Sequence, residues 1–424
     1  MVYSSPMGIH YQRKKSGLTV DPPYLILADN HPEIHAIVQE MSNQSIPFLL
    51  ISNLVLKPSE SQILLKILGR FKLLRGWITR RTLKLQGENF KIIRVLIFLD
   101  VLVKVTNQIH FFTLSNYLNR IYSVCFKKRI SKIIANFEGK IIIVSEAIEV
   151  DSKPDKELIT IAFHGSPELV NQMIKQAKQL WTDWKNSEKY VTRTNNSIEY
   201  ADQIIVLSNF SKTGFDSDSV FKNKVNVIPI GGINLNDNSE FFFHKRQELR
   251  TFLYLGRLTL TKGLPVFIDA AKSFSGRAYF KAAGNLVAPI PGWPNLTTAI
   301  PALSFEFGPS ADQVRKLYGT SDFYINPSYY EGFGIASIEA MSFGCIPILS
   351  KYSAAPEILS NTELEKYIFD PTVENSLKNV LNHILELTDK ELEVLSEISV
   401  MLSKKFTFES FAQTFVNRLR DHRD

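Results

Sequence analysis

The chain has 424 residues, of which 45% are hydrophobic and 21% charged, and its formal net charge is +7 at pH 7. This length excludes a single compact core and predicts two domains of about 200 residues each. The presence of only two cysteines, Cys125 and Cys345, argues against a disulfide framework and favours a reducing, cytoplasmic environment. The N-terminal residues lack the apolar core of a signal peptide, so nothing indicates secretion.

Strand and helix signals alternate along the chain, which is typical of doubly wound α/β domains. In chain order, we expect strands at 24–28, 46–51, 141–144, 159–163, 204–207 and 225–228, and then at 252–255, 278–281, 323–326 and 346–349. The last segment, about 407–421, has apolar residues at helical spacing and is expected to bury one face.

A basic region lies in the first half of the chain. Residues 61–132 contain fifteen Lys and Arg residues but only two acidic ones, Glu88 and Asp100, a local charge of +13. Aliphatic and aromatic residues are interleaved with the charges, as on a helix that lies on an anionic membrane surface. The apolar run 92–105 is too short to span a bilayer, so we expect a peripheral protein without a transmembrane helix. The alternative is a set of packed helices with a solvated basic face. Nucleic acid is not the expected partner, because no groove-reading motif is present.

Two segments of the first half could carry chemistry. His164 follows the apolar run 158–163 and is expected at the carboxyl end of a parallel strand, where α/β folds bind ligands. A lone histidine at such a place is more often structural. Asp216 and Asp218 have a spacing that can hold a metal through oxygen ligands. Because they lie in a polar loop, we interpret them as a turn and predict no metal requirement.

The segment 252–263 reads as a strand followed by a loop that carries Gly256, Arg257, Lys262 and Gly263. A guanidinium at a strand end can clamp phosphate oxygens at two points, and a lysine adds a movable charge. Together they could neutralise a diphosphate leaving group. Taken singly, each would be an ordinary surface residue on a βα loop.

The segment 326–347 reads as a strand, a glycine-bearing turn and a helix start. Gly332 and Gly334 allow close approach of a ligand, and a helix from about Ile335 offers free N–H groups to an anion. Glu339 would lie about one turn inside that helix and reach back to the site, where hydroxyl groups of a ribose or sugar could donate to it. Glu331 and Glu339 would then flank a sugar nucleotide. The alternative is a dipole-favoured acid and a solvated turn residue.

The run Pro-Ser-Tyr-Tyr-Glu331-Gly-Phe-Gly-Ile-Ala-Ser-Ile-Glu339 resembles the signature of retaining glycosyltransferases of family four (glycosyl transferases group 1). Segments that match in order are 163–165, 201–212, 225–232 and 252–263. The resemblance is continuous from about 160 to 360 and fades in the first 150 residues. It implies the GT-B fold, in which two Rossmann-like doubly wound domains face each other across a cleft. The expected parts are 1–222 on the acceptor side, 223–405 for the nucleotide sugar, and 406–424 as a helix that crosses back.

The resemblance also implies a retaining hexosyltransferase that moves a sugar from a nucleotide diphosphate sugar to a glycan or lipid-linked acceptor, without metal or other cofactor. Glu339 would hold the ribose, and Arg257 with Lys262 at Gly256 would hold the diphosphate. The donor sugar would contact His164 from the opposite domain and the turn residues Glu331, Gly332, Phe333, Gly334 and Ile335. No covalent nucleophile emerges, so a front-face mechanism is implied.

Some residues depart from the family pattern. The segment 28–32, Ala-Asp-Asn-His-Pro, replaces the usual glycine-rich loop after the first strand, and Gly284-Asn285 replaces a Gly-x-Gly turn. Two alternative functions stay open. One is a GT-B sugar-nucleotide epimerase, which would need an acid and a base around the sugar. The other is a noncatalytic, membrane-associated subunit that only binds sugar nucleotide.

Overall fold

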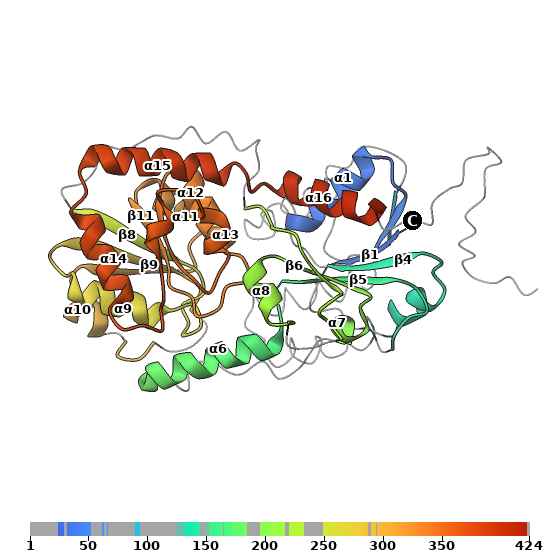
Figure 1. The fold of residues 1–424 in the computed structure, drawn as a ribbon, viewed down its shortest axis with the longest axis horizontal. Coiled ribbons are helices and arrows are strands. Elements are labelled where there is room, and N and C mark those ends of the chain that lie inside the picture. Colours follow the sequence, from blue (N-terminus) through green and yellow to red (C-terminus); the bar gives the residue numbers. More distant parts are fainter. Residues whose placement is uncertain are drawn as a thin grey trace, which may run out of the picture.

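A computed structural model describes residues 24–28, 32–51, 90–93, 130–144, 152–163, 165–184, 196–216, 220–232, 249–286, 290–293 and 295–421, with the single residues 62, 66, 125, 128 and 150. They form two lobes that lie side by side (Figure 1). Each lobe is built on a parallel sheet with helices on its faces. The doubly wound α/β architecture expected from the alternating signals is therefore confirmed.

The first lobe contains a seven-stranded sheet of order β3-β2-β1-β4-β5-β6-β7. All neighbouring strands pair in parallel, so that Tyr24 lies opposite both Phe48 and Lys140. The strands are β1 (Tyr24–Ala28), β2 (Phe48–Ile51), β3 (Phe90–Ile93), β4 (Lys140–Val144), β5 (Leu158–Ala162), β6 (Gln203–Val206) and β7 (Val225–Val227). The helices are α1 (Pro32–Asn43), α6 (Pro167–Leu180), α7 (Asn196–Tyr200) and α8 (Asn209–Thr213), with a 3₁₀ turn at Thr182–Trp184.

The second lobe repeats this arrangement with six parallel strands of order β10-β9-β8-β11-β12-β13. The strands are β8 (Arg250–Leu255), β9 (Ala278–Gly284), β10 (Leu303–Phe307), β11 (Phe323–Asn326), β12 (Ile346–Ser350) and β13 (Ile368–Phe369). The helices are α9 (Leu264–Ser273), α10 (Asn295–Ala299), α11 (Ala311–Gly319), α12 (Ile335–Ser342), α13 (Ala355–Leu359), α14 (Ser376–Leu385) and α15 (Asp389–Ser403), with a 3₁₀ turn at Glu365–Tyr367. Strands β10 and β13 were not expected from the sequence.

Both faces of the first sheet are covered, which explains why its central strands are continuous apolar runs. Every residue of β1 is buried. Tyr24, Ile26 and Ala28 belong to one core with α1, whereas Leu25 and Leu27 belong to a second core with the helical segment 130–135. This alternation follows from the two-residue period of a strand, which sends successive side chains to opposite faces.

The chain passes between the lobes twice. Gly232 N–H donates to the Phe406 carbonyl at 3.0 Å, and a Cβ on Gly231 would lie only 1.9 Å from the Thr407 carbonyl carbon. The last helix, α16 (Phe408–Asp421), then packs against α1 in the first lobe (Figure 1). The Tyr24 hydroxyl donates to the backbone of this helix at Leu419. The two crossing segments thus tie the lobes together at one side.

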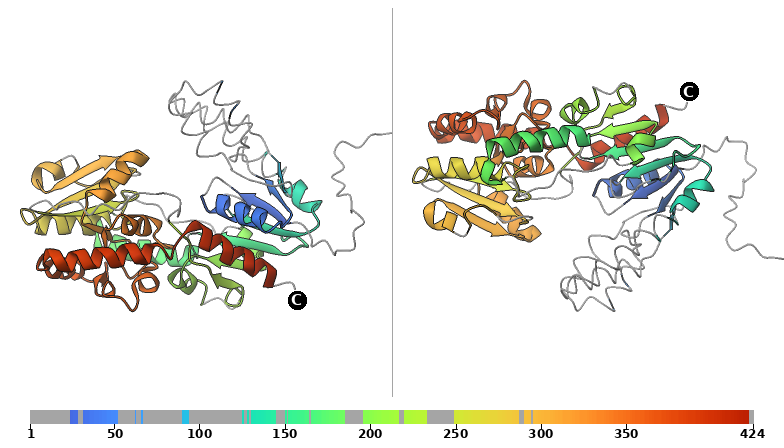
Figure 2. Two further views of the ribbon diagram at one scale, coloured as in Figure 1. Left: turned by 90° about the horizontal axis from the view of Figure 1, so that it is seen from above. Right: turned by 90° about the horizontal axis from the view of Figure 1, so that it is seen from below.

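The predicted boundary between residues 222 and 223 differs from the sheet topology. Strand β7, Val225–Val227, pairs with β6 and belongs to the first sheet, because its three residues continue the parallel register there. The strands of the two sheets therefore separate between residues 227 and 250. Helix α6 reaches from the first lobe alongside the second, as the views of Figure 2 also show. The loops at the carboxyl ends of β5 and β6 meet the loop after β11.

Candidate active site

The turn between β11 and α12 carries the paired glutamates and is tightly held. Asn326 ends β11, and its side-chain oxygen accepts hydrogen bonds from the N–H and the hydroxyl of Ser328. Gly334 has φ +104°, a conformation that favours glycine, and α12 begins at the next residue as predicted. Among the described residues no side chain caps this helix, so its first N–H groups and the positive end of its dipole have no side-chain partner there. A helix start of this kind can bind an anion.

The loop between β8 and α9 lies beside it. The Tyr254 hydroxyl donates to the carbonyl of Arg257 at 2.6 Å, and Leu258 N–H donates to the carbonyl of Asn285 at 3.0 Å. These bonds fix the backbone around Gly256 while the Arg257 side chain stays exposed. Within the described part of the chain, the guanidinium has no hydrogen-bond or ion-pair partner. Arg257 is thus available to an anionic ligand.

The two loops are joined backbone to backbone. Tyr329 N–H donates to the Thr261 carbonyl at 2.8 Å. Gly263 has φ +71°, and a Cβ at this position would lie 1.9 Å from the Pro327 carbonyl oxygen. Glycine at 263 is therefore required by conformation and by close approach together. The contact brings the end of β8 against the end of β11.

This junction pairs Lys262 with Glu331. The Lys262 Nζ lies 2.8 Å from Glu331 Oε2 and 3.4 Å from the Tyr330 carbonyl. Both side chains are largely buried, with 18% and 22% of their surfaces exposed. An ammonium group has three donors, so one remains for a ligand after these two contacts. The structure brings these two predicted site residues together.

Glu339 lies one turn inside α12 and is mostly buried. The Tyr318 hydroxyl donates to Glu339 Oε2 at 3.0 Å, whereas no described residue donates to the other carboxylate oxygen. Burial raises the pKa of Glu339, and the bond from Tyr318 opposes that shift. Such a buried carboxylate is stabilised by additional hydrogen-bond donors, which ligand hydroxyls can provide.

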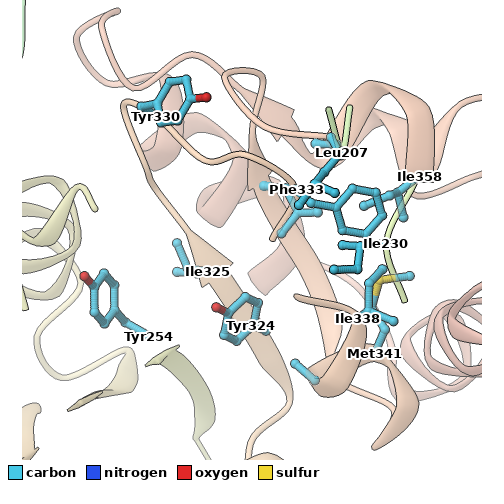
Figure 3. Packing of buried hydrophobic residues seen from close by; sticks show 14 of the residues in the cluster. Leu207, Ile230, Tyr254, Tyr324, Ile325, Tyr330, Phe333, Ile338, Met341 and Ile358 are labelled. Atoms are coloured by element: carbon cyan, nitrogen blue, oxygen red, sulfur yellow. The ribbon is translucent and has the colours of Figure 1, made fainter. Parts of the chain in front are cut away.

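Tyr324, in β11, is hydrogen-bonded to the end of β8 just before the Arg257 loop. It is fully buried, and its hydroxyl donates to the Leu255 carbonyl, which precedes Gly256. Burial raises the pKa of Tyr324, and the charges of Glu331 and Glu339 raise it further. Figure 3 shows Tyr324 with Tyr254 and Tyr330 in this part of the core.

The first lobe contacts this site at the carboxyl end of β5. A Cβ on Gly332 would lie 2.3 Å from the Phe163 carbonyl oxygen, and one on Gly165 would lie 2.4 Å from the Tyr330 hydroxyl. His164 lies outside the described residues, so its predicted contact with a donor sugar stays a prediction. Its two chain neighbours nevertheless reach the glycine turn.

Other sequence expectations have different outcomes. Asp216 ends a turn after α8, whereas Asp218 and the segment 29–31 of the atypical first loop lie outside the described residues. No cluster of three potential metal ligands occurs among the described residues, and the absence of a metal requirement stays a prediction. In the same part of the chain, no helix has the length and apolar character to cross a bilayer. Most of the basic region 61–132 also lies outside it, although Lys66, Lys128 and Lys132 are exposed.

Sequence reasoning missed a set of contacts between the lobes. The hydroxyls of Ser208 and Ser211 donate to the Gly332 carbonyl at 2.6 and 3.0 Å. Asn209 N–H donates to Glu357 Oε1 at 2.7 Å, and Trp181 Nε1 donates to the Tyr329 hydroxyl at 2.7 Å. Ser208 and Ser211 lie in the segment 201–212 that resembles the family, and Ser208 follows a strand where a helix cap is common, but neither signal identifies a partner in the other lobe.

Comparison with known proteins gives the family context. The family model described as "Glycosyl transferases group 1" matches residues 236–399, which include both loops of the site. A GDP-mannose:cellobiosyl-diphosphopolyprenol alpha-mannosyltransferase of Xanthomonas oryzae pv. oryzae is 36% identical over 112 residues, 24% of this chain and 28% of the relative. A glycogen synthase of Thermodesulfovibrio yellowstonii is 20% identical over 211 residues, 47% of this chain and 38% of the relative. Matches to the first curated relatives span 22% to 54% of their lengths.

The solved structures cover the whole fold. Anabaena HepE, crystallised in complex with UDP-glucose, aligns with a TM-score of 0.55 at 14% identity and covers 94% of this chain and 99% of that one. At this identity the likeness concerns the fold alone. The chain therefore has the GT-B fold, and residues 236–399 of its second lobe are similar to the glycosyl transferases of group 1.

Proposed function

We propose that this protein transfers a hexose from a nucleotide diphosphate sugar to a glycan or lipid-linked acceptor, with retention of anomeric configuration and without a metal ion. The family supports glycosyl transfer in general. The donor class is also supported by relatives whose names specify GDP-mannose and by a structural neighbour that binds UDP-glucose.

One observation carries the proposal. The 2.8 Å pair of Lys262 and Glu331 joins two loops at the carboxyl ends of β8 and β11, next to the uncapped start of α12. A cation, a carboxylate and a helix N-terminus at one point suit a ligand that is both anionic and rich in hydroxyls. A nucleotide diphosphate sugar has both properties.

The charge of each site residue suggests which part of the donor it would bind. Arg257 and Lys262, with the N-terminus of α12, would neutralise the diphosphate as it departs, and they supply the positive charge that a metal would otherwise provide. Glu339, through the carboxylate oxygen to which no described residue donates, would accept hydrogen bonds from the ribose. Glu331 and the N–H groups of the turn would orient the donor sugar.

The proposed reaction breaks the bond between the anomeric carbon and the phosphate oxygen and forms one to an acceptor hydroxyl oxygen. The acceptor proton passes to the departing phosphate oxygen on the same face of the sugar, which retains the configuration. No described side chain is assigned as a nucleophile. Position 164 would approach the sugar from the first lobe, since both of its neighbours contact the glycine turn.

The proposal of a lipid-linked acceptor is based on the positive charge of residues 61–132. Residues 61–132 carry fifteen basic and two acidic side chains, an excess that attracts anionic lipid headgroups. A lipid-linked acceptor would place the enzyme on a membrane surface. Binding to vesicles with and without anionic lipid measures this part of the proposal separately from catalysis.

A screen of thermal stability tests the donor class. UDP-, GDP- and ADP-linked hexoses are each added to the protein, and the matching donor raises the unfolding temperature, because a ligand at 100 times its Kd stabilises by about 2.7 kcal/mol. With that donor, nucleoside diphosphate release is followed with and without EDTA. We expect release that EDTA does not reduce. Stabilisation by none of the donors would contradict the proposal. Detection of an epimerised nucleotide sugar as the product would show that the enzyme is an epimerase and not a transferase.

A further inference from the structure

The carbonyl of Gly332 is the point at which the first lobe holds the glycine turn. It accepts hydrogen bonds from the hydroxyls of Ser208 and Ser211, at 2.6 and 3.0 Å. Both serines are completely buried. Ser208 also caps α8, because its hydroxyl accepts from Ser211 N–H at 3.0 Å. Two donors from a helix start in one lobe thus saturate one carbonyl in the other.

The orientation of this carbonyl sets the orientation of an N–H group. A peptide unit is planar and trans, so the N–H of Phe333 points opposite to the carbonyl of Gly332. Within the described residues, the N–H groups of Phe333 and Gly334 have no hydrogen-bond partner. When the serines hold the carbonyl toward α8, the Phe333 N–H is presented on the other side of the turn.

The side chain after this peptide is fixed as well. Phe333 is 3% exposed, and Figure 3 shows its ring beside Leu207 and Ile230 of the first lobe and Ile358 of the second. Gly332 approaches the Phe163 carbonyl so closely that no Cβ fits. The peptide between 332 and 333 therefore lies at the contact between the lobes.

A second contact holds α8 in place. Glu357, from α13 of the second lobe, accepts from Asn209 N–H at 2.7 Å. The Phe210 ring lies 5.5 Å from that of Tyr330 and 5.8 Å from that of Tyr352. The start of α8 is thus bound by the second lobe on both sides of the glycine turn, which suits a docking element better than a solvent-facing helix end.

We propose that Ser208 and Ser211 are positioning residues that orient the Gly332–Phe333 peptide for the donor sugar when the lobes dock, an inference that rests on the proposed function. The sugar-binding part of the site is then complete only with the first lobe in place. The diphosphate-binding part, at Lys262 and Arg257, belongs to the second lobe alone.

This division predicts a selective loss of affinity. The double variant Ser208→Ala, Ser211→Ala is compared with the wild type for binding of UDP, GDP, UDP-glucose and GDP-mannose by calorimetry. For the nucleotide sugar that the wild type binds, we expect Kd to rise about tenfold, as for a lost hydrogen bond in a buried site, whereas Kd for its nucleoside diphosphate changes less than about threefold. Hydrogen exchange of the peptide that spans 330–336 should also be faster in the variant.

Two further variants keep the comparison clear. Ser399→Ala removes an equally buried hydroxyl from α15, where its partner is the Leu395 carbonyl, and it should bind both ligands as the wild type does. Ser211→Ala leaves the cap of α8 in place, so it gives the same selective loss in a smaller degree if the double variant does not fold. Equal losses for nucleotide and nucleotide sugar, or no loss, would overturn the positioning role alone. Failure of the wild type to bind any of the four ligands would overturn the proposed function and this inference with it.

Discussion

Replacement of Lys262 by alanine separates a catalytic role from a structural one. The Lys262 Nζ contacts Glu331 Oε2 at 2.8 Å and the Tyr330 carbonyl at 3.4 Å, which leaves one donor for a phosphate oxygen. The two side chains are 18% and 22% exposed, so loss of the pair should cost more free energy than loss of a surface pair and less than loss of a fully buried pair. We expect the free energy of unfolding to fall by about 1–2 kcal/mol.

The effect of the same change on catalysis should be much larger. Removal of one preorganised donor to a developing negative charge costs about 100- to 1000-fold in rate. We therefore expect kcat/KM for nucleoside diphosphate release to fall by about that factor, with the fold intact. Lys272→Ala, at the exposed C-terminal end of α9, the helix that follows Lys262, is the matched control and should retain full activity. The reasoning would be refuted by a Lys262→Ala protein whose free energy of unfolding falls as expected but whose kcat/KM falls by less than about threefold.

Three other outcomes are expected. Glu339→Gln removes a carboxyl group whose pKa is raised by burial. The buried carboxyl of the wild type must ionise as pH rises through that pKa, so denaturant titrations should show the variant gaining stability relative to the wild type between about pH 4 and pH 7. The donor affinity of the variant should fall. An unchanged stability difference across this range would contradict the burial. Gly263→Ala forces a Cβ against the Pro327 carbonyl and should cost about 2–4 kcal/mol of unfolding free energy, with loss of nucleotide binding; wild-type binding would contradict the docked loops. A thiol reagent should modify exposed Cys125 quickly and buried Cys345 only in denaturant, and rapid modification of both would contradict the burial of Cys345.

Much of the second lobe could be predicted from the sequence because its signals are local. An apolar run that ends in Gly-Arg predicted β8, and the glycine turn predicted the start of α12 at Ile335. The period of apolar residues and the placement of glycines are properties of one segment at a time. Both loops of the site could be predicted because each lies within a single segment. The edge strands β10 and β13 were missed, since β10 fully buries only one of its five residues and β13 has only two residues.

The contacts between the lobes could not be predicted in the same way. Ser208 donates to a carbonyl 124 positions away, and Trp181 to a hydroxyl 148 positions away. A capping serine and a helix-end tryptophan satisfy local rules wherever they occur, so their sequence context does not identify the partner. The pairing of Lys262 with Glu331 also depends on the close approach at Gly263, which appears only when two loops meet.

A crystal structure with the nucleotide sugar that stabilises the protein most in the donor screen would test the central claim directly. The account predicts a diphosphate between the side chains of Arg257 and Lys262 and the start of α12, with the ribose hydroxyls on Glu339. A nucleotide bound away from the ends of β8 and β11, or a diphosphate with both basic side chains turned away, would contradict it.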